Sequence, residues 1–281
     1  MQFGDYTCFT IDLDRFRLDG GAMFGVVPKP LWEQKVPPDE KNRIPMAARS
    51  LIIKGRNKLI LVDTGLGDKL PEKFQKIYGI DNPNRSMAER LAPWNIRPED
   101  ITDVIITHLH FDHAGGNTLI ENGQVRPTFP NATYHLQKCQ WDFAQTPSVR
   151  DQASYIPDNF MPLSDNHQLN IINGPTNDLF DGIELLVTDG HTDGQQHPLI
   201  LGEKTALFVC ADLIPTAAHL PLTWHMAYDN HPISLISEKA EILNRAVNNG
   251  WILCFEHDPE IAAATIKRSG DRVVMDQAVT L

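Results

Sequence analysis

The alternation of apolar and polar positions along the chain predicts a mixed α/β fold. Residues 50–65, SLIIKGRNKLILVDTG, place apolar runs on both sides of a GRNK turn and predict a β-hairpin. Residues 197–212, HPLILGEKTALFVCAD, predict a second hairpin that turns at GEK. Shorter apolar runs in residues 98–108, 182–191 and 251–257 predict further buried strands.

Helical periodicity is strongest near the C-terminal end. Apolar residues recur at 233, 236, 240, 243 and 247, Pro232 stands before them and Gly250 follows, so residues 232–249 are predicted to form an amphipathic helix. Residues 86–94 predict a shorter helix with Ser86 as its N-cap. Residues 131–144 predict a strand that passes into a helix.

No Gly/Ser linker or charge block divides the chain, so we expect a single domain over residues 1–281. Two proline-rich segments with aromatic residues, 27–45 and 212–232, are candidate binding loops. No apolar run approaches the roughly 20 residues of a membrane span, and the first residues carry acids where a signal peptide has a basic end. We therefore expect a cytoplasmic protein.

Polar side chains with metal-binding chemistry stand where the predicted strands end. They are Asp63, His108, His191, Asp212 and His257. Strand ends at one edge of a sheet converge in space, and functional sites are built there. The sequence therefore predicts one site assembled from distant segments.

The most crowded of these segments is THLHFDHAGG, residues 107–116. His108 and His110 are two residues apart, so an extended backbone points both rings the same way, and Asp112 and His113 follow as the chain turns. The two glycines suit positive φ and close backbone approach. This segment alone supplies four ligand-type side chains, and further candidates lie elsewhere in the chain. Together they are more ligands than one tetrahedral metal ion can bind, so the sequence predicts two metal ions. Histidine and carboxylate donors fit Zn²⁺, Mn²⁺, Fe²⁺ or Co²⁺.

Charge and cysteine usage narrow the chemistry further. The net charge is −11, from 25 basic and 36 acidic side chains, which disfavours nucleic acid and other polyanionic partners. The four cysteines are widely spaced with no CxxC pair, which disfavours a disulfide framework and a thiolate zinc site. We expect a small-molecule substrate and no membrane partner; the oligomeric state is left open.

THLHFDHAGG, preceded by LILVDTG and followed by DGHTDG, CAD and EHD, resembles the metallo-β-lactamase fold superfamily. The resemblance implies a four-layer αββα sandwich of two similar halves with two metal ions, most often zinc, at one edge. It implies that Asp212 bridges both ions and that Asp63 orients a ligand histidine. The remaining implied ligands are His108, His110 and His191 for the first ion and Asp112, His113 and His257 for the second. The chain departs from the frequent GHTPGH pattern, with Asp193 and Gln195 where proline and histidine stand.

A narrower resemblance lies before the histidine motif. The segments DGGAMFGVVPKPLW and DEKNRI resemble the bacterial quorum-quenching N-acyl-homoserine lactonases. The resemblance implies that a metal-bridging hydroxide opens a lactone, while Asp112 moves a proton to the leaving group. His225, beside Trp224 in the second candidate loop, is the expected substrate contact. Phe24 and Trp32 are candidates to line an apolar acyl pocket.

Other reactions on the same fold stay open. One alternative is a thioester hydrolase of the glyoxalase II type, although the loop between Leu213 and Ser237 offers no lysine or arginine to an anionic carrier. Another is a phosphotriesterase-like hydrolase. An oxygen-reducing or sulfur-oxidising enzyme is the third; His110 stands where a di-iron reductase keeps a carboxylate, which argues against that reading.

Overall fold

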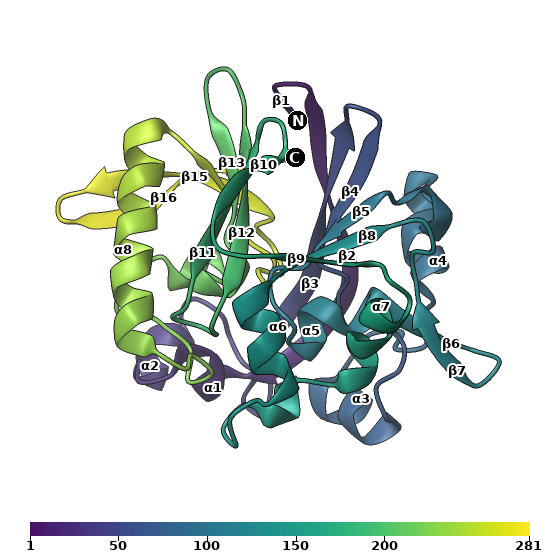
Figure 1. Ribbon diagram of the computed structural model, residues 1–281. Helices are drawn as coiled ribbons and strands as arrows, with labels where there is room; N and C mark the ends of the chain where they lie inside the picture. The colour runs from purple at the N-terminus through teal and green to yellow at the C-terminus, as the bar shows by residue number, and fades with distance from the viewer. The chain divides into compact units, whose positions relative to one another are not determined.

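The computed structural model describes the whole chain, Met1 to Leu281, and its Cα positions form two compact units (Figure 1). Unit 1 comprises Met1–Gly4, Arg15–Ala47 and Pro175–Leu281, and unit 2 comprises Asp5–Asp14 and Ala48–Gly174. The expected single domain over residues 1–281 stays a prediction. None of the helices combines the length and the apolarity that a bilayer-spanning segment requires.

Two seven-stranded sheets account for most of the strands. The first has the order β1-β2-β3-β4-β5-β8-β9. Its strands are β1 (Gln2–Phe3), β2 (Tyr6–Asp19), β3 (Arg43–Gly55), β4 (Lys58–Val62), β5 (Asp103–Ile105), β8 (Thr133–Gln137) and β9 (Leu169–Ile172). The second has the order β10-β11-β12-β13-β14-β15-β16. Its strands are β10 (Thr176–Phe180), β11 (Ile183–Thr188), β12 (Gln195–Leu201), β13 (Ala206–Val209), β14 (Ile252–Cys254), β15 (Ala263–Ser269) and β16 (Arg272–Val279).

Besides the two sheets, the chain forms one small hairpin, eight α-helices and seven short 3-10 helices. The hairpin pairs β6 (Thr118–Glu121) with β7 (Gln124–Pro127). The helices are α1 (Gly20–Phe24), α2 (Lys29–Trp32), α3 (Glu72–Tyr78), α4 (Met87–Leu91), α5 (Phe111–Ala114), α6 (Lys138–Gln145), α7 (Met161–Asp165) and α8 (Pro232–Asn249).

The predicted hairpins and the short helix are confirmed. β3 and β4 pair antiparallel around Arg56 and Asn57, whose φ angles of 50° and 60° match the left-handed turn that two-residue hairpins favour. β12 and β13 pair in the same way. At the start of α4, the Ser86 side chain accepts from the Glu89 amide while Glu89 accepts from the Ser86 amide, a capping box.

Each unit has its own apolar core. In unit 2 the parallel strands β4, β5 and β8 contribute Leu61, Val104 and Leu136, all fully buried. In unit 1 β13 and β14 contribute Phe208 and Leu253, which pack with side chains of α8. Burying one such side chain stabilises the fold by about 1.5–3 kcal/mol. These short strands with buried apolar side chains therefore hold rigid the edges from which the predicted site residues extend.

The long helix α8 spans the predicted residues, but its buried face differs from the predicted apolar positions. The structure buries Leu235, Lys239, Ile242, Leu243 and Ala246, whereas Ile233 is 78% exposed. The difference arises from hydrogen bonds of Lys239. Its ammonium donates to carbonyl oxygens of the preceding loop, so a lysine instead of an apolar residue lies at the centre of the buried face.

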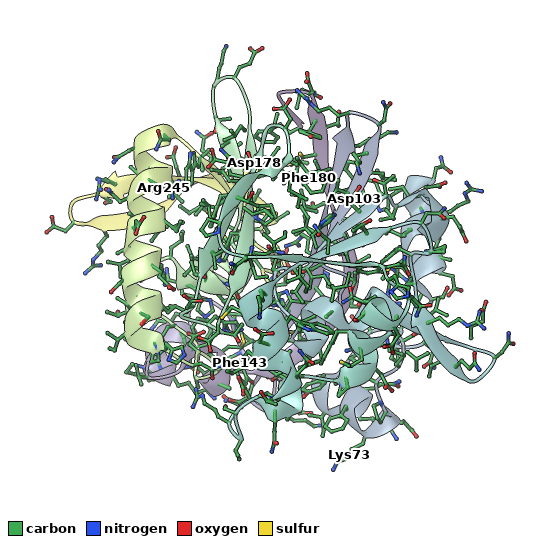
Figure 2. All side chains as sticks on the ribbon, in the orientation of Figure 1. Lys73, Asp103, Phe143, Asp178, Phe180 and Arg245 are labelled. Carbon is green, nitrogen blue, oxygen red and sulfur yellow. The ribbon has the colours of Figure 1, made fainter.

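Asp103, at the start of β5 (Figure 2), is the centre of a buried polar cluster. Its carboxylate accepts from His135 Nε2 at 2.9 Å, Lys58 Nζ at 2.8 Å and Thr102 Oγ1 at 2.7 Å. Burial by itself raises the pKa of Asp103, but these hydrogen bonds outweigh burial and lower the pKa to about 2. The folded state therefore binds this proton less tightly than the unfolded chain does.

We expect this depressed pKa to contribute about 2 kcal/mol to the free energy of unfolding near neutral pH. The folded pKa lies below the unfolded value, so the contribution is full above about pH 4 and is lost as the pH falls towards 2. Urea unfolding of the wild type and Asp103→Asn at several pH values measures it. The difference in the free energy of unfolding between the two proteins should decrease as the pH falls towards about 2. A difference that is the same at every pH would contradict the prediction.

Candidate metal centre

Four predicted ligands stand at the same distance along the chain from the strand before them. Strands β5, β11, β13 and β14 end at positions 105, 188, 209 and 254, and the residues three positions later are His108, His191, Asp212 and His257. In unit 1, β13 and β14 are parallel neighbours with Val209 opposite Cys254, so equal offsets carry Asp212 and His257 to the same sheet edge. The topology thus explains how residues 45 positions apart meet.

Unit 2 holds four of the predicted ligands, His108, His110, Asp112 and His113, which we call the 108–113 group. His108 Nε2 lies 3.0 Å from His110 Nδ1. Asp112 and His113 lie on the single turn of α5, and all four side chains are buried. Two ring nitrogens so close together require a proton or a cation between them, because two lone pairs repel.

Asp63 follows β4 directly and contacts the 108–113 group. Its Oδ2 lies 2.8 Å from His113 Nδ1, and its carboxylate accepts from both the amide and the hydroxyl of Thr107. Because a carboxylate can only accept here, Nδ1 of His113 carries a proton, and in the neutral ring Nε2 then keeps the lone pair. Asp63 has a φ of 56°, a conformation that is strained for residues other than glycine. Such strain is often found at functional positions. This is the contact expected of a carboxylate that orients a ligand histidine; its effect on metal binding stays a prediction.

The two glycines that end the motif are explained by close packing. A Cβ on Gly115 would lie 2.2 Å from the Leu66 carbonyl oxygen, and one on Gly116 would lie 2.3 Å from that of Thr64. The expectation of positive φ was wrong for both glycines, and the φ of Gly115 is −59°. Close approach alone requires glycine here, and it brings the loop after β4 against the turn that carries Asp112 and His113.

Unit 1 holds the other three predicted ligands, His191, Asp212 and His257, which we call the 191–257 group. His191 Nε2 lies 3.1 Å from Asp212 Oδ2, and His257 Nε2 lies 3.0 Å from Asp212 Oδ1. The opposite ring nitrogens have their own acceptors, Asp229 at 2.8 Å for His191 and the Ala47 carbonyl at 2.8 Å for His257. One carboxylate thus presents each of its oxygens to a different imidazole.

Electrostatics in the 191–257 group favour positive charge. Burial lowers the pKa of His191, but the carboxylates of Asp212 and then Asp229 outweigh burial and raise the pKa to about 9. The two carboxylates therefore attract a cation to a site that is shielded from water. By contrast, burial lowers the pKa of His197, whose Nδ1 donates to the Val209 carbonyl, to about 4 and keeps that ring neutral.

The donor set fits a transition-metal site. All seven predicted ligands are buried and offer imidazole nitrogen or carboxylate oxygen, the donors that Zn²⁺ and similar ions take. In both groups the Nδ1 atom of a histidine is hydrogen-bonded to a carboxylate, at His113 and at His191. That pairing is typical of histidines that bind metals.

The structure buries two of the three predicted substrate contacts. Phe24 and Trp32 are 0% and 1% exposed and stack with ring centroids 5.3 Å apart, and Phe24 also stacks on His219. Phe24 and Trp32 are packed in the interior in this structure, so their role in lining an acyl pocket stays a prediction. His225 is partly exposed, and its Nδ1 donates to the Met226 carbonyl and lies 3.5 Å from Asp229 Oδ2.

Three residues near these groups were missed from the sequence. Asp229 and Lys239 are buried polar side chains in the second candidate loop and in α8. Tyr155, whose ring packs on His110 with centroids 4.8 Å apart, lies in an irregular segment. None of the three left a local signal, because Lys239 stands between the predicted apolar positions of the helix and contacts made across long stretches of chain leave no local pattern.

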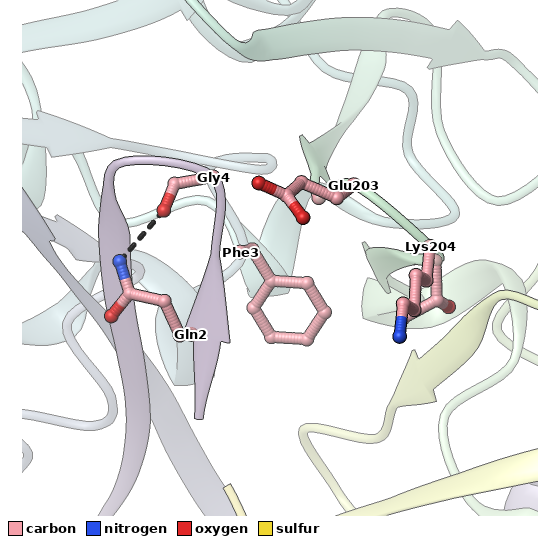
Figure 3. Close-up of a pocket in the computed structure, with 7 residues that line it drawn as sticks. Gln2, Phe3, Gly4, Glu203 and Lys204 are labelled. Carbon is pink, nitrogen blue, oxygen red and sulfur yellow. Dashed lines mark hydrogen bonds between the residues drawn. The ribbon is translucent and has the colours of Figure 1, made fainter.

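A shallow pocket in unit 1 lies away from the 191–257 group. It is lined by Gln2, Phe3, Gly4 and the β12–β13 turn, residues 202–205 (Figure 3). Asp212 follows the opposite end of β13, so the pocket and this ligand group occupy different ends of the sheet. Its polar side chains are those of Gln2, Glu203, Lys204 and Thr205.

Comparison with known proteins identifies curated relatives over part of the chain. An N-acyl homoserine lactonase from Bacillus cereus is 34% identical over 157 residues, 53% of this chain and 56% of the relative. N-acyl homoserine lactonase AttM from Rhizobium radiobacter is 29% identical over 142 residues, 48% of this chain and 50% of the relative. The matched region thus spans about half the length of these relatives.

Solved structures match the fold over the full chain. A probable metal-dependent hydrolase from Staphylococcus aureus aligns with a TM-score of 0.88 and 28% identity, covering 100% of both chains. AidC, a dizinc quorum-quenching lactonase solved with its product N-hexanoyl-L-homoserine, aligns with a TM-score of 0.81 over 100% of this chain and 97% of AidC; at 20% identity it shows the fold alone. The predicted mixed α/β fold of the metallo-β-lactamase type is confirmed.

The family assignment rests on sequence as well. The profile of the Metallo-beta-lactamase superfamily matches residues 43–257, which include Asp63 and all seven predicted ligands. Since this match covers well over half of the 281 residues, the chain belongs to the metallo-beta-lactamase superfamily.

Proposed function

We propose that the chain is a hydrolase with two divalent metal ions, most simply zinc, that opens N-acyl-homoserine lactones or related esters. The observation that supports it most strongly is the Asp212 carboxylate, which directs one oxygen to His191 Nε2 and the other to His257 Nε2. A carboxylate placed in this way suits a bridge between two cations. The lactonase relatives favour a lactone over other electrophiles.

The ligands divide between the ions as the family resemblance implies. His108, His110 and His191 would hold the first ion, and Asp112, His113 and His257 the second, with Asp212 shared. Divalent ions in such a pair would polarise a carbonyl oxygen and lower the pKa of a water molecule towards neutrality. Cytoplasmic location and a role in quorum quenching stay predictions.

The chain's own residues supply positioning and proton transfer. Asp63 fixes the ring of His113 through Nδ1. Asp112, on the single turn of α5, is the group we assign to proton transfer: its carboxylate takes the proton released by the attacking water and passes it to the departing oxygen. For a lactone, that oxygen becomes the hydroxyl of the opened product.

Aromatic residues beside Asp112 favour a substrate with an apolar portion. Helix α3 buries none of its residues and leaves Phe74 and Ile77 40% and 47% exposed. Tyr78 stacks on Phe74 and, at 5.0 Å, on Phe111, the residue before Asp112. The Asp112 charge also contributes, after burial, to the raised pKa of Tyr78. An exposed apolar surface thus extends from α3 to the residue next to Asp112, the proposed proton-transfer group. Such a surface suits the binding of an acyl chain.

The loop after Asp212 gives independent support from unit 1. Residues 213–231 contain no lysine or arginine. Lys239, which contacts this loop from α8, is buried and donates to the carbonyl oxygens of Pro221 and Trp224. A phosphate or a glutathione carboxylate would find no exposed cation here, whereas a neutral lactone requires none.

The test compares kcat/KM for N-acyl-homoserine lactones, simple γ-lactones, lactoylglutathione and a phosphotriester at one metal loading. We expect the acyl-homoserine lactones to rank first. If lactoylglutathione were preferred tenfold or more, about 1.4 kcal/mol in transition-state binding, the glyoxalase II reading would replace the proposal. A first rank for the phosphotriester would favour the phosphotriesterase reading.

Removing one exposed ring tests the apolar surface. We expect Phe74→Ser to lower kcat/KM about fivefold for a decanoyl lactone and hardly at all for a butanoyl lactone, because only the longer chain reaches α3. Trp94→Ser is the matched control, since Trp94 is a similarly exposed ring (47%) that stacks on Phe9. Equal losses for both chain lengths, or equal effects of both variants, would argue against α3 as the acyl site.

A further inference from the structure

The imidazole of His191 is held from both sides by carboxylates. Its Nε2 faces Asp212 at 3.1 Å, and its Nδ1 lies 2.8 Å from Oδ1 of Asp229. Asp229 stands 38 residues further along the chain, in the irregular loop before α8. The side chains of His191 and Asp229 are each only 1% exposed, so water does not compete for this hydrogen bond.

Asp229 is itself fixed by the turn that carries it. Its Oδ2 accepts from the backbone amide of Met226 at 2.7 Å, three residues earlier. His225 Nδ1 lies 3.5 Å from the same oxygen. Both carboxylate oxygens thus have defined partners, and the oxygen that meets His191 has little freedom to turn away.

The backbones around His191 and Asp229 are joined as well. The Asn230 amide donates to the His191 carbonyl at 3.0 Å, and the His231 amide donates to the Gly190 carbonyl at 2.8 Å. The imidazole and its carboxylate partner therefore lie on two segments that hold each other in register. A shift of one segment would shift the other.

The loop that supplies Asp229 is anchored to the rest of unit 1 at several points. Lys239 donates to the Pro221 and Trp224 carbonyls at 2.9 and 2.8 Å. The Ala227 amide donates to the Ala22 carbonyl at 2.8 Å. Gly25, with a φ of 55°, leaves no room for a side chain because a Cβ would lie 2.8 Å from the His225 carbonyl oxygen.

We propose that Asp229 is a positioning residue for His191: it accepts the Nδ1 proton, so that Nε2 presents its lone pair to a metal ion beside Asp212. It has the same relation to His191 in unit 1 that Asp63 has to His113 in unit 2. The inference rests on the proposed role of His191 as a metal ligand. It adds that residues 225–229, which include the expected substrate contact His225, and this ligand form one rigid part.

The experiment measures zinc affinity by competition with a chromophoric chelator on the metal-loaded protein. We expect Asp229→Asn to weaken the binding of one ion by about 10- to 100-fold, the usual effect of removing such a carboxylate. Asp229→Ala should weaken it further, because the asparagine oxygen still accepts from Nδ1–H and alanine offers no acceptor. With cobalt in place of zinc, the visible absorption of Asp229→Asn should shift at full loading. If the alanine variant fails to fold, the near-isosteric asparagine variant decides alone.

Two further variants separate the possible outcomes. Lys239→Met loosens the same loop through its carbonyl contacts and leaves the Asp229 carboxylate in place, so we expect a clearly smaller loss of metal affinity than in Asp229→Asn. Equal losses in Lys239→Met and Asp229→Asn, or unchanged affinity in Asp229→Asn, would overturn the inference. His191→Ala tests the premise: if it keeps both ions at full affinity, the proposed ligand set is wrong, whereas loss in His191→Ala without loss in Asp229→Asn removes only the role of Asp229.

Discussion

Replacing Asp212 with alanine is expected to remove at least one of the two proposed metal ions and to lower kcat/KM about a thousandfold or more. The two oxygens of the Asp212 carboxylate meet Nε2 atoms of two different histidines, at 3.1 and 3.0 Å. A residue shared by both ions affects both when it is lost. A metal pair contributes several kcal/mol to the transition state, and about 4 kcal/mol corresponds to a thousandfold.

Elemental analysis and steady-state kinetics measure the two parts of this result. Wild-type protein should carry about two ions per chain. His225→Ala is the control, because His225 lies in the same unit and is a proposed substrate contact rather than a proposed metal ligand; at saturating metal it should keep both ions and change KM or kcat. An Asp212→Ala protein with two ions and the wild-type rate would disprove the bridge.

Much of the candidate site follows from local sequence. The ligand-type residues after β5, β11, β13 and β14 were predictable because a short, mainly apolar run marks a buried strand and the polar residues after it mark its end. The crowding of His108, His110, Asp112 and His113 needs no tertiary information at all. Asp63 was found in the same way, directly after β4.

Contacts between distant segments could not be predicted in this way. Asp229 meets His191 because the loop before α8 folds back over the strand end, and nothing within a few residues of Asp229 signals this. The face of α8 was misjudged for the same reason, since the loop carbonyls that receive Lys239 lie 15 and 18 residues away. Phe24 and Trp32 were proposed to line an acyl pocket, and only the fold shows them buried.

The fold class was predictable because it depends on element order and on the histidine motif, both of which are local. The partition of the chain into two compact units was not predictable from the sequence. Unit 1 is assembled from three separate stretches, and β2 (Tyr6–Asp19) and β3 (Arg43–Gly55) each begin in one unit and end in the other. A sequence scan that looks for linkers cannot detect a division that runs through the middle of strands.

The second large effect is expected from Asp112→Asn, which should lower kcat for a lactone by a factor of about 10² to 10⁴, the usual contribution of a general acid–base group. Asparagine keeps the size and an oxygen donor of aspartate, so metal content should change little. It cannot take up and release a proton near neutral pH. Asp142→Asn, a change at a half-exposed aspartate on α6, is the control and should have no effect.

The identity of the leaving group decides whether this loss reports proton transfer. The alkoxide released when a lactone opens is strongly basic and needs a proton as it departs, whereas 4-nitrophenolate leaves without one. If Asp112 delivers that proton, Asp112→Asn should impair lactone hydrolysis far more than hydrolysis of a 4-nitrophenyl ester with the same acyl chain. The two substrates share the attacking water, the metal ions and the apolar surface of α3, so any damage to those would lower both rates equally. A common loss would therefore assign Asp112 to metal binding or to the proton of the attacking water, and a selective loss would assign it to the proton that completes ring opening.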